Sequence, residues 1–300
     1  MGIVLGANQY GKAEVRLVHV DRSTPQHRIT DLTVTTQLRG DFDACHTHGD
    51  NRAVVPTDTQ RNTVYAFARE TGVCQPEEFG LRLGRHFIDI NEAVTGARVA
   101  VDHHPWARIE VGGVGHDHAF ARAGAARRTT IVTVDGADAW VVSGLTGLAV
   151  LKTTGSEFHG YPRDRYTTLA ETRDRILATA VTARWRYDDS ALDAGFDFAT
   201  AHTGARTALV EAFAEHHSLA LQQTLYAMGS AVLADRTITE VRLSMPNLHH
   251  FLVDLSPFGL DNPDTVYYAA DRPYGLIEAS VLRDDGPPPG GAWDSVPGFC

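Results

Sequence analysis

Hydrophobic and polar residues alternate over residues 14–21 and again over residues 29–38, which predicts two β-strands joined by a turn. From residue 58 the hydrophobic spacing becomes helical, with Pro56 just before it as a helix-start signal. A second helix is predicted for residues 76–90. Strand patterns then return, at residues 97–111, 119–122, 128–134 and 140–151.

The second half of the chain repeats this order of strands, helices and strands. Residues 176–187 predict a strand, residues 205–234 a long or broken helical region, and residues 238–244 and 250–255 two further strands. This order predicts an α+β fold in which helices pack on one face of antiparallel sheets. The proline- and glycine-rich segment 285–291 is expected to be flexible and without regular structure.

The composition is typical of a globular protein that can bury a large core, with 300 residues, 43% hydrophobic and 21% charged. The formal net charge of −10 argues against a nucleic acid or an anionic membrane as partner, because both select basic surfaces. No apolar run approaches the roughly 20 residues of a membrane span. Because the net charge of the chain is negative, an anionic substrate must be attracted by a local cationic pocket.

The three cysteines, Cys45, Cys74 and Cys300, are odd in number and lack the spacing of metal ligands. We expect a reducing, intracellular environment, and the sequence assigns these thiols no role. Residues 1–10 do not form a secretory leader, and residues 298–300 are not a peroxisomal Ser-Lys-Leu signal. We therefore expect a cytoplasmic protein.

Neither a metal nor an organic cofactor is predicted. The histidine pairs at 46/48, 103/104 and 116/118 do not match a helix-borne metal motif such as H-E-x-x-H. Residues 112–115 lack the glycine spacing of a dinucleotide fingerprint, so flavin and nicotinamide are unsupported. A nucleophile-elbow hydrolase is unsupported as well, because G-x-S-x-G does not occur.

Residues 154–176 carry the most informative motif, because they place an aromatic ring and a guanidinium on one connected segment, as Phe158 and Arg175. Polar residues gather in two further segments, 8–12 and 245–251. Residues of these types suit the binding of a flat, electron-rich anion. An aromatic face can stack on it, a planar guanidinium can hydrogen-bond to it within its plane, and titratable groups can lie near its edge. Taken singly, Phe158 would be a core residue and Arg175 a surface ion-pair partner.

These motifs closely resemble those of urate oxidases (uricases) over nearly the whole chain. The resemblance implies tandem tunnelling-fold (T-fold) domains, which we place at residues 1–136 and 137–300. In such folds the sheets join between subunits into a barrel around a central tunnel. The resemblance further implies a homotetramer with active sites at subunit interfaces, and cofactor-free oxidation of urate by dioxygen and water to 5-hydroxyisourate and hydrogen peroxide.

The resemblance implies three catalytic residues, Lys12, Thr57 and His249, which move protons. Lysine acts as a base only when burial or a nearby cation lowers its pKa, and a solvated surface lysine is the alternative reading of Lys12. A helix N-cap is the alternative reading of Thr57. Asp58 joins Thr57 in the substrate-binding set, at a helix start whose free N–H groups suit an anion.

The resemblance also assigns the remaining substrate-binding residues. Phe158 stacks on the purine, and Arg175 holds its carbonyl and ring-nitrogen edge. Gln222 pairs with the opposite edge, since a carboxamide offers a donor and an acceptor side by side. Leu221 contributes through its backbone, and Asn247 marks the place above the ring where dioxygen, and later water, waits.

The family often has a lysine between the residues that match Asn247 and His249, where this chain has Leu248. Strand alternation predicts that Leu248 points away from its two neighbours, which would leave the site intact.

Two other functions stay open. A non-catalytic purine-binding protein of the same fold would keep the pocket, but it would not need Lys12, Thr57 and His249 together. A tunnelling-fold pterin enzyme would need metal-ligating histidines and a glutamate anchor, and the pair of Arg175 and Gln222 fits urate better.

Overall fold

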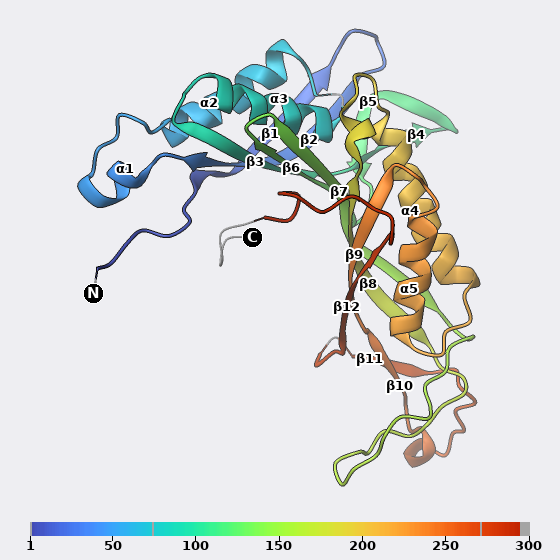
Figure 1. The fold of residues 1–300 in the computed structure, drawn as a ribbon. Helices are drawn as coiled ribbons and strands as arrows, with labels where there is room; N and C mark the ends of the chain where they lie inside the picture. The colour runs from blue at the N-terminus through green and yellow to red at the C-terminus, as the bar shows by residue number, and fades with distance from the viewer. Residues whose placement is uncertain (1, 74, 271, 295–300) are drawn as a thin grey trace. The chain divides into compact units, whose positions relative to one another are not determined.

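The computed structural model describes residues 2–73, 75–270 and 272–294 (Figure 1). The chain forms two compact units. The first comprises Met1–Gly144, Arg186–Ala199 and Pro287–Cys300, and the second comprises Leu145–Trp185 and Thr200–Gly286. Within the described ranges, no helix is both long enough and apolar enough to cross a membrane.

The first unit is an antiparallel sheet covered by helices. Its strand order is β1-β2-β3-β6, followed by the start of β7. A separate hairpin is formed by β4 and β5. The elements of this unit are β1 (Tyr10–Asp21), β2 (Arg28–Gly40), α1 (Asp43–His48), α2 (Thr57–Glu70), α3 (Pro76–Asp89), β3 (Val94–His103), β4 (Trp106–Val111), β5 (Val114–Arg122), β6 (Arg127–Asp135), β7 (Asp138–Lys152), which continues into the second unit, and the short helix η1 (Asp189–Leu192).

Helix α3 forms much of the core of the first unit because its apolar face meets β3 and β6. Phe79, Leu83 and Phe87 are fully buried, and burying each of them stabilises the fold by about 1.5–3 kcal/mol. The helix lies close to the sheet: a Cβ atom at Gly80 would be 2.8 Å from Cγ2 of Val132. Any larger residue at this position would push α3 away from β6.

The second unit repeats the combination of sheet and helices. Its strand order is β7-β8-β9-β12, with α5 packed on β9 and β12. A two-stranded sheet of β10 and β11 follows β9 along the chain. The last residues of β8 and the first of α4 belong to the first unit. The elements are β8 (Leu177–Tyr187), α4 (Phe198–Glu215), α5 (Leu221–Val232), β9 (Ile238–Pro246), β10 (His249–Leu252), η2 (Ser256–Phe258), β11 (Tyr267–Ala270) and β12 (Leu276–Leu282).

The α+β class and the antiparallel sheets confirm the prediction from the sequence. The predicted strand at 97–111 is wrong in one respect, because His104 and Pro105 separate β3 from β4. Proline lacks the N–H group that a central strand needs. The helical region 205–234 is broken, with α4 and α5 separated by residues 216–220. The helix α1 and the strands β11 and β12 were not predicted.

Residues 285–291 form no helix or strand, as predicted, but part of this segment is anchored. Buried Arg186 donates hydrogen bonds to the carbonyl oxygens of Pro287 (2.8 Å) and Pro288 (3.3 Å). Gly290 and Gly291 lie directly against the indole ring of Trp140. These contacts hold the end of the described chain to the first unit.

Candidate active site

Lys12 lies on β1 immediately before a β-bulge. The pairing of β1 with β2 shifts between Lys12 and Val15, and Glu14 has a φ angle of 56°. The Glu14 N–H donates to the hydroxyl of Thr35 at 3.0 Å. This hydrogen bond satisfies a backbone N–H that the bulge leaves without a backbone partner on β2. Bulges of this kind re-aim neighbouring side chains and are common beside active sites.

An ion pair places Lys12 next to the first turn of α2. The Nζ atom of Lys12 lies 3.9 Å from Oδ1 of Asp58, and Oδ2 of the same carboxylate accepts a hydrogen bond from Arg61 at 2.8 Å. The side chains of Lys12 and Asp58 are 33% and 61% exposed, so the pair contributes at most about 1 kcal/mol to stability. Its importance is positional, because it brings the lysine to the turn that carries Thr57.

Thr57 is the first residue of α2, and it is not the N-cap. Pro56 occupies the N-cap position, and no side chain caps this end of the helix. The alternative reading of Thr57 as an N-cap is therefore wrong. The first N–H groups of a helix have no partner within it, and together with the helix dipole they favour an anion. The segment before α2 is anchored to β1, because the Val55 N–H donates to the hydroxyl of Tyr10 at 2.8 Å.

In the second unit, backbone pairing brings Phe158 and Arg175 together. Phe158 and Thr172 exchange two hydrogen bonds, of 2.9 and 3.0 Å. The guanidinium carbon of Arg175 then lies 5.2 Å from the centre of the Phe158 ring, and Nε donates to the hydroxyl of Ser156 at 3.3 Å. Burial lowers the pKa of Arg175 below its usual range, but an arginine stays charged at neutral pH. The guanidinium thus lies over the Phe158 ring, which also stacks with the ring of Tyr161, with 5.0 Å between the ring centres.

Leu221 and Gln222 are the first two residues of α5. The N-cap is Ala220, and its side chain makes no capping hydrogen bond. Leu221 is 2% exposed whereas Gln222 is exposed, so the leucine anchors the helix start and the amide faces outward. Like α2, this helix begins with N–H groups that have no partner within the helix.

Asn247 and His249 lie at the junction of β9 and β10. The Asn247 N–H donates to the carbonyl of Gly275 at 2.8 Å. Burial lowers the pKa of His249 below 6.5, and the positive charges of Arg175 and His250 lower it further. The imidazole therefore favours its neutral form, which can accept a proton.

Leu248 lies outside both β9 and β10. Its N–H donates to the carbonyl of Ala178 on β8 at 2.9 Å, and its side chain is half-buried. Strand alternation therefore does not decide where this side chain points.

The predicted residues fall into two groups, each within one unit. We call the first group, Lys12, Thr57 and Asp58, the proton-transfer half-site. The second group, the ring-binding half-site, comprises Phe158, Arg175, Leu221, Gln222, Asn247 and His249.

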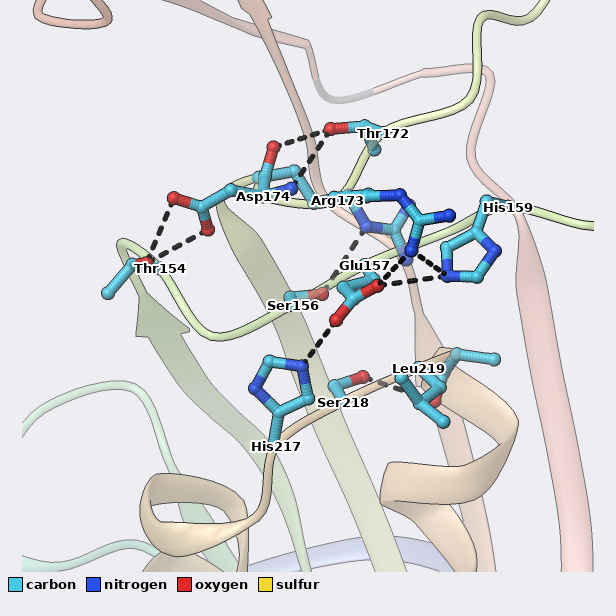
Figure 2. A network of polar contacts seen from close by, with 12 residues as sticks. Thr154, Ser156, Glu157, His159, Thr172, Arg173, Asp174, His217, Ser218 and Leu219 are labelled. Carbon is cyan, nitrogen blue, oxygen red and sulfur yellow. Dashed lines mark hydrogen bonds and ion pairs between the residues drawn. The ribbon is translucent and has the colours of Figure 1, made fainter.

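A polar network centred on Glu157 was not predicted from the sequence; Figure 2 shows it. The pattern of Glu157 and His159 on either side of Phe158 was the available signal. Among the cysteines, Cys45 donates to Oδ1 of Asn51 at 3.3 Å, whereas Cys74 and Cys300 lie outside the described residues. In residues 2–73, 75–270 and 272–294, no three histidine, cysteine or acidic side chains are grouped to hold a metal ion.

Comparison with known proteins gives one consistent result. The family model described as Uricase matches residues 8–133 and 141–278. The uricase of Arthrobacter globiformis is 56% identical over 99% of this chain and 96% of its own length, and that of Aspergillus flavus is 37% identical over 92% and 96%. A crystal structure of the Arthrobacter globiformis uricase covers 96% of this chain and 98% of its own, with a TM-score of 0.90. This chain belongs to the uricase family.

Proposed function

We propose that this chain oxidises urate with dioxygen and water to 5-hydroxyisourate and hydrogen peroxide, without a metal or an organic cofactor. Membership of the uricase family supports an oxidoreductase that acts on urate, and it does not favour the non-catalytic alternative. One observation about the site carries the chemistry. A guanidinium lies 5.2 Å from the centre of an aromatic ring on one segment, and its charge acts on a histidine with a lowered pKa.

The reaction needs no cofactor because the purine supplies the electrons. Once deprotonated, the urate ring is electron-rich enough to reduce dioxygen. Two electrons and two protons pass to dioxygen to form hydrogen peroxide, and the oxygen of water is added to the oxidised ring. The protein need only deprotonate, orient and desolvate the substrate.

Each half-site then has one task. In the ring-binding half-site, Phe158 stacks on the purine and Arg175 and Gln222 hold opposite edges of it. Asn247 places the oxygen species above the ring plane. The backbone N–H of Leu221 adds a donor at the start of α5.

In the proton-transfer half-site, Lys12 and Thr57 receive the proton of the substrate, and His249 completes the relay. The N–H groups at the start of α2, beside Asp58, stabilise the negative charge. The first proton transfer and the binding of the ring thus fall to different half-sites, and His249 contributes to the relay from the ring-binding half-site.

We further propose a homotetramer of two stacked T-fold barrels in the cytoplasm, with T-fold domains at residues 1–136 and 137–300 and active sites at subunit interfaces. The strand orders end at β1 in the first unit and at β12 in the second, and open strand edges favour association. Apolar side chains on β10 and β11, including Phe251 (52% exposed) and Tyr268 (62% exposed), support additional contacts. An assembly with closed dihedral symmetry would cover both the open strand edges and these apolar side chains.

A single assay tests the proposed reaction. Protein stripped by exhaustive chelation should deplete the ultraviolet absorbance of urate in air-saturated buffer, release one hydrogen peroxide per urate and show no flavin absorbance. A stoichiometric metal or flavin that turnover requires would contradict the cofactor-free reaction. Urate that binds without loss of absorbance would instead indicate a purine-binding protein, and turnover of a pterin but not of urate would indicate a pterin enzyme.

We expect the acid limb of the kcat/KM profile to lie below the ordinary histidine pKa of 6.5. The pKa of His249 is lowered in the folded protein, so the neutral, proton-accepting imidazole persists to lower pH than in a free histidine. Because His250 contributes to the lowering, His250→Asn should move the limb to higher pH. The exposed His48 on α1 provides the control, since His48→Asn should leave the limb in place. A limb that moves to lower pH in His250→Asn would contradict the role of His249.

A further inference from the structure

Four of the six residues of the ring-binding half-site lie on three segments that are distant along the chain; the other two, Asn247 and His249, lie at the junction of β9 and β10. Phe158 lies on the first arm of the loop between β7 and β8, and Arg175 on its second arm. Leu221 and Gln222 begin α5, after the linker of residues 216–220. To hold one flat ligand in a single orientation, these segments must keep a fixed geometry relative to one another.

Backbone hydrogen bonds join these segments only at single points. The Glu157 N–H donates to the carbonyl of Ser218 at 2.7 Å, and the Ser218 N–H donates to the carbonyl of Gly155 at 3.0 Å. On the other side, the first arm meets the second through the pair of Phe158 and Thr172. Isolated bridges like these lack the cooperative support of a continuous sheet.

The side chain of Glu157 connects the same three segments (Figure 2). Its Oε1 atom lies 2.8 Å from Nε2 of His217 on the linker before α5, and Oε2 lies 2.9 Å from Nε2 of His159 on the first arm. The second arm contributes Arg173, whose Nη1 lies 3.8 Å from Oε2. One carboxylate is thus shared by groups from all three of these segments.

The environment of Glu157 favours its charged form. The hydrogen bond from His217 is the largest cause that lowers its pKa, and the bond from His159 lowers it further. The side chain is 17% exposed, although its partners His217 and Arg173 are 57% and 79% exposed. The carboxylate is therefore the shielded centre of the network, and solvent surrounds its partners.

We infer that Glu157 is a positioning residue for the ring-binding half-site: its carboxylate fixes Phe158, Arg175 and the start of α5 relative to one another. This inference rests on the proposed urate site. Glu157 does not touch the reacting atoms in this assignment, and it acts through the residues that do. Its loss should therefore impair substrate capture more than the chemical step.

We expect Glu157→Ala to raise the KM for urate about tenfold and to leave kcat within about twofold, the signature of lost uniform binding. Glu157→Gln retains the shape but not the charge, and it should give an intermediate KM. Binding of xanthine, a purine that lacks the 8-oxo group of urate, should weaken in parallel when measured by calorimetry. Glu211→Gln, an exposed change on α4, is the matched control and should leave all three quantities unchanged.

A cycle with His217→Asn separates positioning from a general loss of stability. If Glu157 acts through His217, the double variant Glu157→Ala/His217→Asn should raise KM by much less than the product of the two single effects. Unchanged KM in both Glu157 variants would overturn the inference, and so would a fall in kcat at constant KM. Should Glu157→Ala fail to fold, Glu157→Gln and His217→Asn carry the test. Absence of urate turnover in the unmodified protein would refute the proposed function instead.

Discussion

Replacing Arg175 with alanine should weaken urate binding by about 2–4 kcal/mol, the range for removing one partner of a desolvated charged pair. Nε of Arg175 is already used, since it donates to the hydroxyl of Ser156 at 3.3 Å. This bond fixes the plane of the guanidinium beside the Phe158 ring. In the proposed site, the terminal N–H groups would then face one edge of a ligand stacked on Phe158.

Arg175→Lys should recover little of this loss. A guanidinium serves two acceptors on one ring edge with parallel N–H groups, whereas an ammonium is a point charge on a flexible stem. The smaller head group would also lose the contact with the Ser156 hydroxyl that orients the fork. Steady-state KM for urate and calorimetric binding of xanthine measure both variants.

Arg184 on β8 supplies the control for the arginine series. It is exposed and belongs to the same unit, so Arg184→Ala removes an equal charge without touching the half-site. If Arg175→Ala kept its KM within a factor of about two, worth roughly 0.4 kcal/mol, Arg175 would be an ordinary surface arginine. A loss that Arg184→Ala reproduced would indicate an effect of net charge alone.

The elements of the first unit were predictable where local signals coincide with tertiary packing. Pro56 and Pro76 mark the starts of α2 and α3, and the helical spacing of apolar residues predicts the turns that follow. The break at Pro105 had the same kind of signal, which the prediction of one strand over residues 97–111 did not use. By contrast, the break between α4 and α5 depends on tertiary contacts, because buried Ser218 pairs with the distant Ser156.

The roles in the candidate site came from the resemblance to urate oxidases, because residue types alone allowed ordinary core and surface readings of Phe158 and Arg175, and the geometry was not predictable. Pro56 occupies the N-cap position of α2. The Thr57 side chain, which the sequence also allowed as a helix cap, is therefore available for another role. The approach of Arg175 to Phe158 depends on the pairing of Phe158 with Thr172, which no periodicity encodes. Glu157 was missed because its importance comes from three partners that only the fold assembles.

Both half-sites combine a helix start with a side chain from a strand or loop. In the first unit, the bulge of β1 directs Lys12 toward the start of α2. In the second, the loop carrying Phe158 is bonded to the linker before α5. Each arrangement leaves helix N–H groups for an anion, which suits a purine anion that needs donors on more than one edge.

The assembly proposal makes the last prediction, which concerns mixed chains. Assayed at a urate concentration near the KM of the unmodified protein, Lys12→Ala should be inactive and Arg175→Ala nearly so, because each change damages one half of every site. Refolded together in equal amounts, they should regain about one quarter of the unmodified activity: half of the dimers are hybrids, and each hybrid rebuilds one intact site of its two.

The recovery follows from how the half-sites are shared. If each active site takes Lys12 from one chain and Arg175 from its neighbour, a hybrid dimer holds one site with both changes and one site with neither. A mixture of Lys12→Ala with the double variant Lys12→Ala/Arg175→Ala is the matched control, since no arrangement of these chains restores Lys12. Mass spectrometry of the intact assemblies must show the hybrids. Hybrids that form but stay inactive would mean that each site is built within one chain, and shared sites would then be excluded.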